Sequence, residues 1–155
     1  MNPTTITAQP GTPFLEVVRE FDATPAEVYR AATDPELVVQ WLGPRSVTMT
    51  LEQWDVRDGG GYRYIHSRDD FTVGFRGVYH TVRPNELVIS TFEFEGAPDQ
   101  VAVETARYED LGDGRTRLVM RSVFPSVEAL ESALQMGMTG GVEESMERLA
   151  ELLAR

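Results

Sequence analysis

The chain has 155 residues, a formal net charge of −11 and no cysteine. Its length fits one domain. The acidic balance disfavours nucleic acid and anionic membranes as partners, because both need a basic surface. The lack of cysteine excludes disulfides and thiolate ligands. All fourteen basic residues are arginine, so no lysine can form a Schiff base or a lysine-dependent phosphate loop.

Two further absences set the expected location and chemistry. No apolar run approaches the roughly 20 residues of a membrane span, and the first dozen residues lack the basic start and apolar core of a signal peptide. We therefore expect a cytoplasmic protein without a membrane span. Two histidines without cysteine make a poor metal site, and we expect neither a metal nor a cofactor.

The N-terminal part predicts an arm, a strand and two helices. Residues 1–13 are rich in Thr, Pro and Gly, which is typical of a flexible arm, and residues 14–155 form the single domain. Phe14 to Phe21 predicts the first strand. Thr24-Pro25 predicts a helix start with Thr24 as N-cap, and a second short helix follows Asp34-Pro35.

The middle of the chain predicts six consecutive strands, because apolar and polar residues alternate with a period of two from Val47 onward. Short turns rich in Gly, Asp and Asn separate the strands, and such connections are typical of an antiparallel meander. The six segments are Met49 to Trp54 or Val56, Tyr62 to His66, Phe71 to Tyr79, Leu87 to Phe94, Gln100 to Tyr108 and Thr116 to Phe124.

The last thirty residues predict one long helix. Apolar or small residues recur at spacings of three and four from Val127 to Leu152, and the helix would be roughly 42 Å long. Gly137, Gly140 and Gly141 lie inside it, and each costs about 1 kcal/mol relative to alanine. Either close packing or a kink explains these glycines, or their missing side chains leave room for a ligand beneath the helix.

These elements predict an α+β fold. A curved antiparallel sheet of about seven strands, with two short helices after the first strand, would wrap round the long C-terminal helix. The helix is the only element long enough to cover the apolar face of such a sheet. This arrangement usually leaves a hollow between sheet and helix.

Several short motifs in this order resemble the START-like helix-grip superfamily (SRPBCC). Within it, the chain is most similar to bacterial stand-alone relatives of the heat-shock-protein ATPase activator homologue family. The resemblance implies a cavity shared by carriers, cyclases and co-chaperone domains, and the fold alone does not fix the function. The motifs are Phe21-Asp22-Ala23-Thr24-Pro25, Thr33-Asp34-Pro35-Glu36, Trp41-Leu42-Gly43-Pro44, Asp55-Val56-Arg57-Asp58-Gly59-Gly60 and Met136-Gly137-Met138.

Aromatic residues on successive strands are the candidate ligand-binding residues. Small-molecule sites are mostly apolar with a few placed polar groups, and tyrosine in a core needs a partner for its hydroxyl. Each of these residues also suits an ordinary core position. The candidates are Trp41, Trp54, Tyr62, Tyr64, Phe75, Tyr79, Phe92, Phe94 and Met138.

Glu104 and His66 are the candidate catalytic residues. If Glu104 faces inward with Ala102, Ala106 and Tyr108, burial would raise its pKa and it could act as a general base. An exposed or arginine-paired Glu104 is the alternative. His66 follows Tyr62 and Tyr64 on one strand face and could act at the cavity mouth, or it could face water at the strand end.

Three functional hypotheses follow. The first is a binding protein for a small hydrophobic or aromatic molecule held between sheet and helix. The second is a cyclase- or lyase-like enzyme that uses Glu104 or His66. The third is a protein-interaction module of co-chaperone type, and a homodimer is a further partner to consider.

Overall fold

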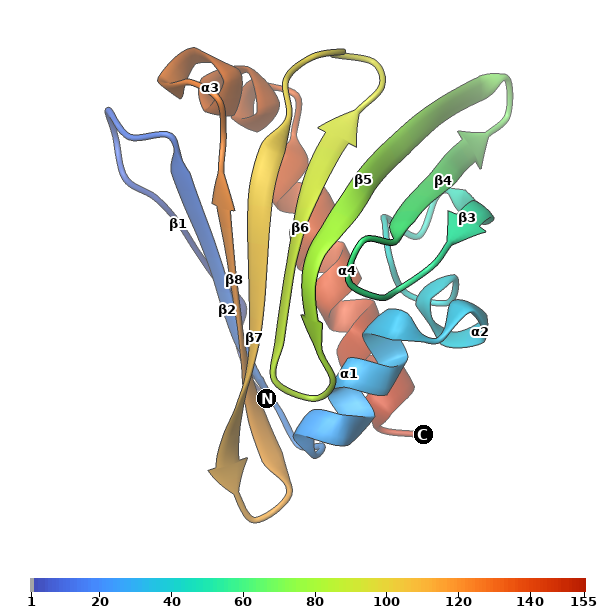
Figure 1. The fold of residues 1–155 in the computed structure, drawn as a ribbon, viewed down its shortest axis with the longest axis vertical. Helices are drawn as coiled ribbons and strands as arrows, with labels where there is room; N and C mark the ends of the chain where they lie inside the picture. Colours follow the sequence, from blue (N-terminus) through green and yellow to red (C-terminus); the bar gives the residue numbers. More distant parts are fainter. Residues whose placement is uncertain (1) are drawn as a thin grey trace.

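The computed structural model describes residues 2–155 as one curved eight-stranded sheet with four helices (Figure 1). The strands lie in the order β1-β2-β8-β7-β6-β5-β4-β3, and every neighbouring pair is antiparallel. The elements are β1 (Thr5–Ala8), β2 (Phe14–Phe21), α1 (Pro25–Thr33), α2 (Pro35–Val38), β3 (Thr48–Trp54), β4 (Gly61–Arg68), β5 (Phe71–Arg83), β6 (Leu87–Phe94), β7 (Ala102–Gly112), β8 (Arg115–Val123), α3 (Val127–Gln135) and α4 (Met138–Leu153).

The six predicted meander strands are confirmed, and the sheet gains one strand at its N-terminal edge. β2 pairs with β8, so the first predicted strand joins the last. Residues 5–8 form β1 within the predicted flexible arm, and Thr5 pairs with Val18. The prediction of an arm is wrong for these four residues. Backbone pairing to the free edge of β2 orders a segment whose composition alone favours disorder.

Side-chain caps explain where the two short helices begin. The Thr24 hydroxyl accepts from the backbone N–H of Glu27 at 3.2 Å, and the Glu27 carboxylate accepts from the backbone N–H of Thr24 at 3.1 Å. This capping box satisfies two N–H groups that a helix start otherwise leaves unpaired. Asp34 caps α2 by accepting from the backbone N–H of Glu36 at 2.9 Å. Both predicted starts are confirmed.

The core lies between the concave face of the sheet and α4, which crosses that face in Figure 1. Leu149 of α4 and Val28 of α1 are 0% exposed, and they belong to one cluster with Val17 of β2 and Leu118 of β8. Burying one such side chain stabilises the fold by about 1.5–3 kcal/mol. The helices therefore cover the sheet through this cluster. No helix in residues 2–155 is long and apolar enough to cross a membrane.

The C-terminal helix is broken, which corrects the prediction of one continuous rod. α3 ends at Gln135, and α4 starts after Gly137, whose backbone is left-handed at φ +86°. Glycine adopts this conformation without the clash that a Cβ would cause. A Cβ built at Gly140 or Gly141 would meet nothing within 4 Å. Close packing therefore does not explain those two glycines, and the kink explains Gly137.

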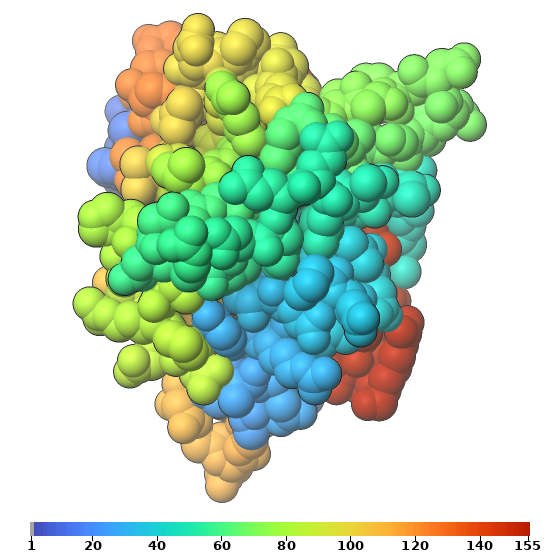
Figure 2. Space-filling view, turned by 45° about the vertical axis from the view of Figure 1, so that its right-hand side comes forward, coloured from blue at the N-terminus to red at the C-terminus, as the bar shows by residue number. Residues whose placement is uncertain are grey.

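The tip of the β4–β5 hairpin projects from the body of the molecule in the space-filling view (Figure 2). Phe71, the first residue of β5, is 53% exposed, although the alternation of the strand predicts an inward side chain. Tyr79 of the same strand is buried. The inward pattern thus applies only where the helices cover the strand.

Replacing two of these glycines by alanine should have opposite effects. Gly137→Ala should lower the free energy of unfolding by about 1 kcal/mol, because alanine is strained in the left-handed region. Gly140→Ala should raise it by about 0.5–1 kcal/mol, because alanine has the higher helix propensity and the site has free space. Chemical denaturation measures both. A change of the same sign in both variants would contradict the helix break.

Candidate functional site

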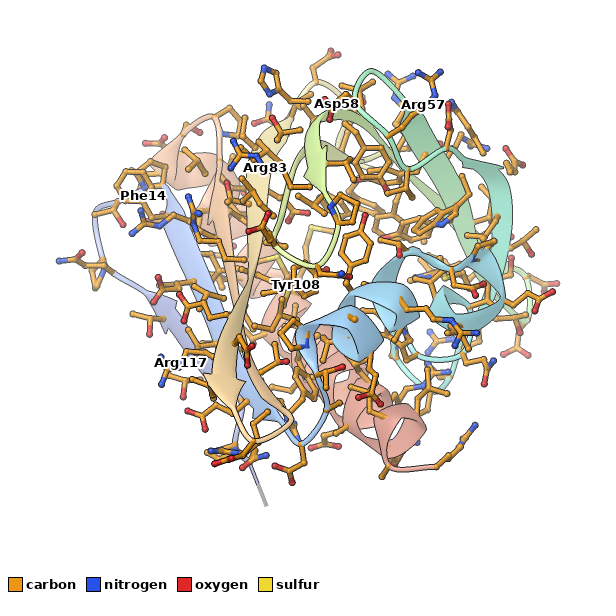
Figure 3. The ribbon with its side chains drawn as sticks, turned by 60° about the horizontal axis from the view of Figure 1, so that its bottom comes forward. Phe14, Arg57, Asp58, Arg83, Tyr108 and Arg117 are labelled. Carbon is orange, nitrogen blue, oxygen red and sulfur yellow. The ribbon has the colours of Figure 1, made fainter. Side chains whose placement is uncertain are left out.

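The inward face of β7 carries the carboxyl group that the sequence singled out. Tyr108 points from β7 toward α1 (Figure 3), and its ring lies 5.5 Å from that of Tyr29. Residues two apart share a strand face, so Glu104 faces inward with Tyr108. Val103 faces the other way and is 47% exposed. The structure therefore places Glu104 on the concave side, and an exposed or arginine-paired Glu104 is ruled out.

A small hollow surrounds Glu104 in the middle of the sheet. Ser122 of β8 donates from Oγ to Glu104 Oε2 at 2.9 Å. On the other side of β7, Ser90 is the residue of β6 that lies opposite Glu104 in the sheet register. The hollow measures about 90 Å³. Its polar wall is thus one carboxyl group between two serines, and its other lining residues are Val88, Thr105, Ala106 and Met120.

Burial raises the pKa of the Glu104 carboxyl, and the hydrogen bond from Ser122 opposes this shift. Glu104 makes no salt bridge within residues 2–155. A low-dielectric surrounding without a cation favours the neutral form. The group can therefore hold a proton at a pH where an exposed glutamate is charged, and it can donate that proton to a bound molecule.

The predicted aromatic residues of β4, β5 and β6 lie next to one another. Ring centroids are 6.0 Å apart for Tyr62 and Tyr64, 5.0 Å for Tyr64 and Phe75, and 5.6 Å for Phe75 and Phe92. Tyr79 lies 5.5 Å from Tyr62. None of these residues lines the hollow at Glu104. They pack against one another as a layer of the core, and their role toward a ligand stays a prediction.

Electrostatics connect this aromatic layer to the hollow. Burial is the main cause that raises the pKa of the Tyr62 and Tyr64 hydroxyls, and the charge of Glu104 adds to it. Tyr62 donates its hydroxyl hydrogen to the Thr91 carbonyl oxygen at 2.7 Å. The tyrosines therefore lie within electrostatic reach of Glu104 and stay neutral.

The remaining predicted residues have structural contacts of their own. Trp41 donates from its indole nitrogen to the Ala31 carbonyl oxygen at 2.8 Å, and Trp54 donates to the Thr33 carbonyl oxygen at 2.7 Å. Phe94 lies 5.4 Å from Phe75, and Met138 is the first residue of α4. The tryptophans thus fix α1 in place, apart from the hollow.

His66 is sealed inside the molecule. It is 7% exposed, and its Nε2 has no hydrogen-bond partner within residues 2–155. Burial is the main cause that lowers the pKa of its imidazole, and the charge of Arg148 adds to it. The alternative of a water-facing His66 is therefore wrong. β5 and β6 separate its strand from that of Glu104, so the two candidates do not form one acid–base pair.

The segment after α2 covers His66 and is held by α4. Gly43 donates its backbone N–H to Ser145 Oγ at 2.8 Å, and Arg148 donates to the Gly43 carbonyl oxygen at 2.7 Å. A Cβ on Gly43 would lie 2.6 Å from His66 Cε1. Only glycine allows this close approach.

Three polar residues on the inward face were not among the predicted site residues. Ser90 and Ser122 flank Glu104, and Arg19 lies on β2 between the buried Val17 and Phe21. The alternation within each strand could have identified these residues, because it shows which positions face inward and a polar residue at an inward position is uncommon. Within residues 2–155, no group of three or more His, Asp or Glu side chains could hold a metal ion.

Comparison with known families and structures gives one family and a consistent fold. The family model described as Activator of Hsp90 ATPase homolog 1-like protein matches residues 22–154. A solution NMR structure of an Arthrobacter aurescens protein has a TM-score of 0.88 at 25% identity, covering 97% of this chain and 91% of that one. A comparison with curated proteins found no match.

Two crystal structures are similarly close. A Rhodobacter sphaeroides protein has a TM-score of 0.87 at 26% identity, covering 97% of this chain and 98% of that one. Protein Ms6760 of Mycobacterium smegmatis has a TM-score of 0.87 at 24% identity, covering 97% of each chain. At 24% identity, the similarity to Ms6760 shows a common fold and nothing more.

The contact between Gly43 and His66 predicts a large effect of one methyl group. Gly43→Ala should lower the free energy of unfolding by about 2–5 kcal/mol, from strain at φ +105° and from overpacking against the ring. Gly59→Ala is the matched control, because it has φ +79° with free space around it and should cost only about 1–2 kcal/mol. Equal losses in the two variants would show that the ring contact is unimportant.

The buried carboxyl group predicts a pH-dependent stability. The folded state binds the Glu104 proton more tightly than the unfolded chain does. The contribution of this carboxyl to the free energy of unfolding therefore falls as pH rises from 4.5 through the raised pKa. Each unit by which the pKa differs between the folded and the unfolded state corresponds to about 1.4 kcal/mol of unfolding free energy. Glu104→Gln should therefore gain stability relative to the wild type as pH rises from 4.5 to 8, as measured by urea denaturation. If the difference in stability between Glu104→Gln and the wild type is constant across this range, the pKa of Glu104 is ordinary.

Proposed function

The chain belongs to the Activator of Hsp90 ATPase homolog 1-like family, and from this premise we propose that it binds a small hydrophobic or aromatic molecule between the sheet and α4. The observation that supports the proposal is the hollow at Glu104, whose lining residues all belong to β6, β7 and β8 on the face of the sheet that α4 crosses. An apolar wall with a few convergent polar groups is the usual composition of a small-molecule site. Here Val88, Ala106 and Met120 supply the apolar wall.

The hollow must widen to hold a ring. Its volume of about 90 Å³ is smaller than the roughly 150 Å³ of an engineered cavity that binds benzene. Met120 lines it, and methionine changes shape more readily than branched side chains. The left-handed backbone at Gly137 breaks the C-terminal helix and is the point at which the start of α4 could shift. Binding would thus combine a side-chain movement with a small helix movement.

The polar wall favours a ligand with one oxygen. A protonated Glu104 can donate a hydrogen bond to a carbonyl or hydroxyl oxygen, and the serine hydroxyls can both donate and accept. A ligand carboxylate is disfavoured, because the hollow holds no cation. We therefore propose a phenol, ketone or similar neutral molecule as the ligand class.

An enzyme of cyclase or lyase type is the second candidate function. The raised pKa of Glu104 favours it, since a general acid must hold its proton near the working pH. The sealed His66 is less suited to the reaction than Glu104. In this case Glu104→Gln would abolish turnover of a substrate that still binds.

Paired probes test the binding proposal. We expect p-cresol to bind at least tenfold more tightly than toluene, as measured by amide shifts in NMR titrations, because only p-cresol has a hydroxyl group for Glu104. Ala106→Phe should abolish binding of p-cresol by filling the hollow. Val103→Phe on the outer face is the control and should leave binding unchanged.

Two outcomes would contradict the binding proposal. One is binding of p-cresol that survives Ala106→Phe in a variant whose thermal unfolding shows an intact fold. The other is no binding of either probe to the wild type.

A further inference from the structure

A second hollow lies next to the β1–β2 edge of the sheet. It is an open groove of about 790 Å³ between the N-terminal residues, β2 and the C-terminal half of α4. Both termini lie at this end of the molecule (Figure 1). The groove shares no lining residue with the hollow at Glu104. Its volume falls in the range of roughly 300–1,000 Å³ that small-molecule sites occupy.

The groove contains a buried cation with an incomplete set of partners. Arg19 is 8% exposed, and its Nε has no hydrogen-bond partner. Nη1 donates to Thr4 Oγ1 at 3.0 Å, and the guanidinium carbon lies 5.6 Å from the centre of the Phe21 ring. Within residues 2–155, no carboxylate forms a salt bridge with Arg19. Buried charges are normally paired, so Arg19 lacks a charged partner and an acceptor for its Nε–H group.

Two unpaired carboxylates lie on the opposite wall. Glu143 and Glu147 are four residues apart on α4, so they share one helix face, and both line the groove. Within residues 2–155, neither forms a salt bridge. The charge of Glu147 acts on Arg19 from a distance and opposes the lowering of the Arg19 pKa by burial.

The other acidic residues of the groove each have an arginine within 4 Å. Glu20 accepts from Arg115 at 2.6 Å and from Arg117 at 3.3 Å, and Glu151 pairs with Arg45 at 2.7 Å. Asp22 lies 3.4 Å from Arg115. The charges without a close partner are therefore one cation on the sheet side and two carboxylates on the helix side.

This charge pattern excludes simple ions as the best ligands. A plain carboxylate would satisfy Arg19 but would meet repulsion from Glu143 and Glu147. A plain amine would be attracted to α4 but would leave Arg19 without an acceptor. A molecule that carries both groups satisfies both walls, and Arg binds a carboxylate through two parallel N–H groups. Apolar side chains between the walls, among them Phe21, Ala150 and Leu153, suit an aliphatic body.

We propose that this groove binds a zwitterionic α-amino acid with an apolar side chain. Arg19 holds the ligand carboxylate, Glu143 and Glu147 hold its ammonium group, and Phe21 and Leu153 contact its side chain. The site is separate from the hollow at Glu104, so a molecule could occupy each.

Three probes of matched shape test the proposal with the wild-type protein. L-Leucine carries both charges, 4-methylpentanoate lacks the amine, and 3-methylbutylamine lacks the carboxylate. We expect leucine to bind at least tenfold more tightly than either of the others in calorimetric or NMR titrations. Equal binding of the three, or no binding of leucine, would overturn the proposal.

Variants locate the site. Arg19→Gln should weaken leucine binding at least tenfold and leave the amine unaffected. Glu147→Gln changes an exposed residue, and it should weaken leucine binding several-fold while it improves binding of 4-methylpentanoate. Arg121→Gln on the outer face is the control for lost positive charge and should change nothing. Ala106→Phe should also leave leucine binding unchanged, which separates this site from the one at Glu104.

A fall in leucine affinity with Arg121→Gln equal to that with Arg19→Gln would refute the assignment. If Arg19→Gln fails to fold, the three probes and Glu147→Gln still decide the question. An unchanged preference for leucine in Glu147→Gln would then count against it.

Discussion

The structure depends on covering the concave face of the sheet with α4. An eight-stranded sheet with one apolar face is unstable in water unless another element buries that face. Leu149 and Met146 of α4 do so against Val28, Val17 and Leu118, which all belong to one buried cluster. The helix is a single narrow rod and the sheet is wide. Inward residues on either side of the contact are therefore covered less completely.

Two of the inward polar groups, Glu104 and Arg19, each line one of the two hollows. Glu104 lies in the middle of the sheet, and Arg19 lies near the β1–β2 edge. Each borders an empty volume, and each lacks the charged partner that a buried ionisable group normally has. An apolar residue at either position would pack more simply. The same incomplete cover thus accounts for both candidate sites, one suited to a neutral molecule and one to a zwitterion. The co-chaperone hypothesis gains no support from these contacts and stays a prediction.

Much of the fold was predictable because local patterns and global packing agree. The period of two predicted the six meander strands, Thr24 marked the first helix start as its N-cap, and the Asp34-Pro35 break marked the second. β1 could not be predicted, since its four residues depend on pairing with β2. A kink was one of the alternatives for Gly137, Gly140 and Gly141, but its position could not be predicted because the apolar period continues through it. Only the backbone angle distinguishes a tolerated glycine from a helix end.

The candidate site was only partly predictable. The inward position of Glu104 follows from alternation with Tyr108, once the strand is in place. The aromatic residues were correctly expected on the inward face, but the sequence does not say whether rings stack on one another or leave a space. Stacking depends on the cross-strand register, which places Phe75 opposite both Tyr64 and Phe94. Arg19 carried the clearest missed signal, as the one charged residue among the inward positions of β2, which are otherwise apolar.

The protonation of Glu104 is the property that most directly tests this account. Carbon-13 NMR of the Glu104 carboxyl carbon, followed from pH 3 to pH 9, reports its titration in the folded protein. We expect a midpoint clearly above the ordinary value of 4.5 and a movement of the signal when p-cresol is added at neutral pH. A midpoint at or below 4.5, with a signal that does not respond to the probe, would mean that the carboxyl is solvated and that no dry ligand site exists at Glu104.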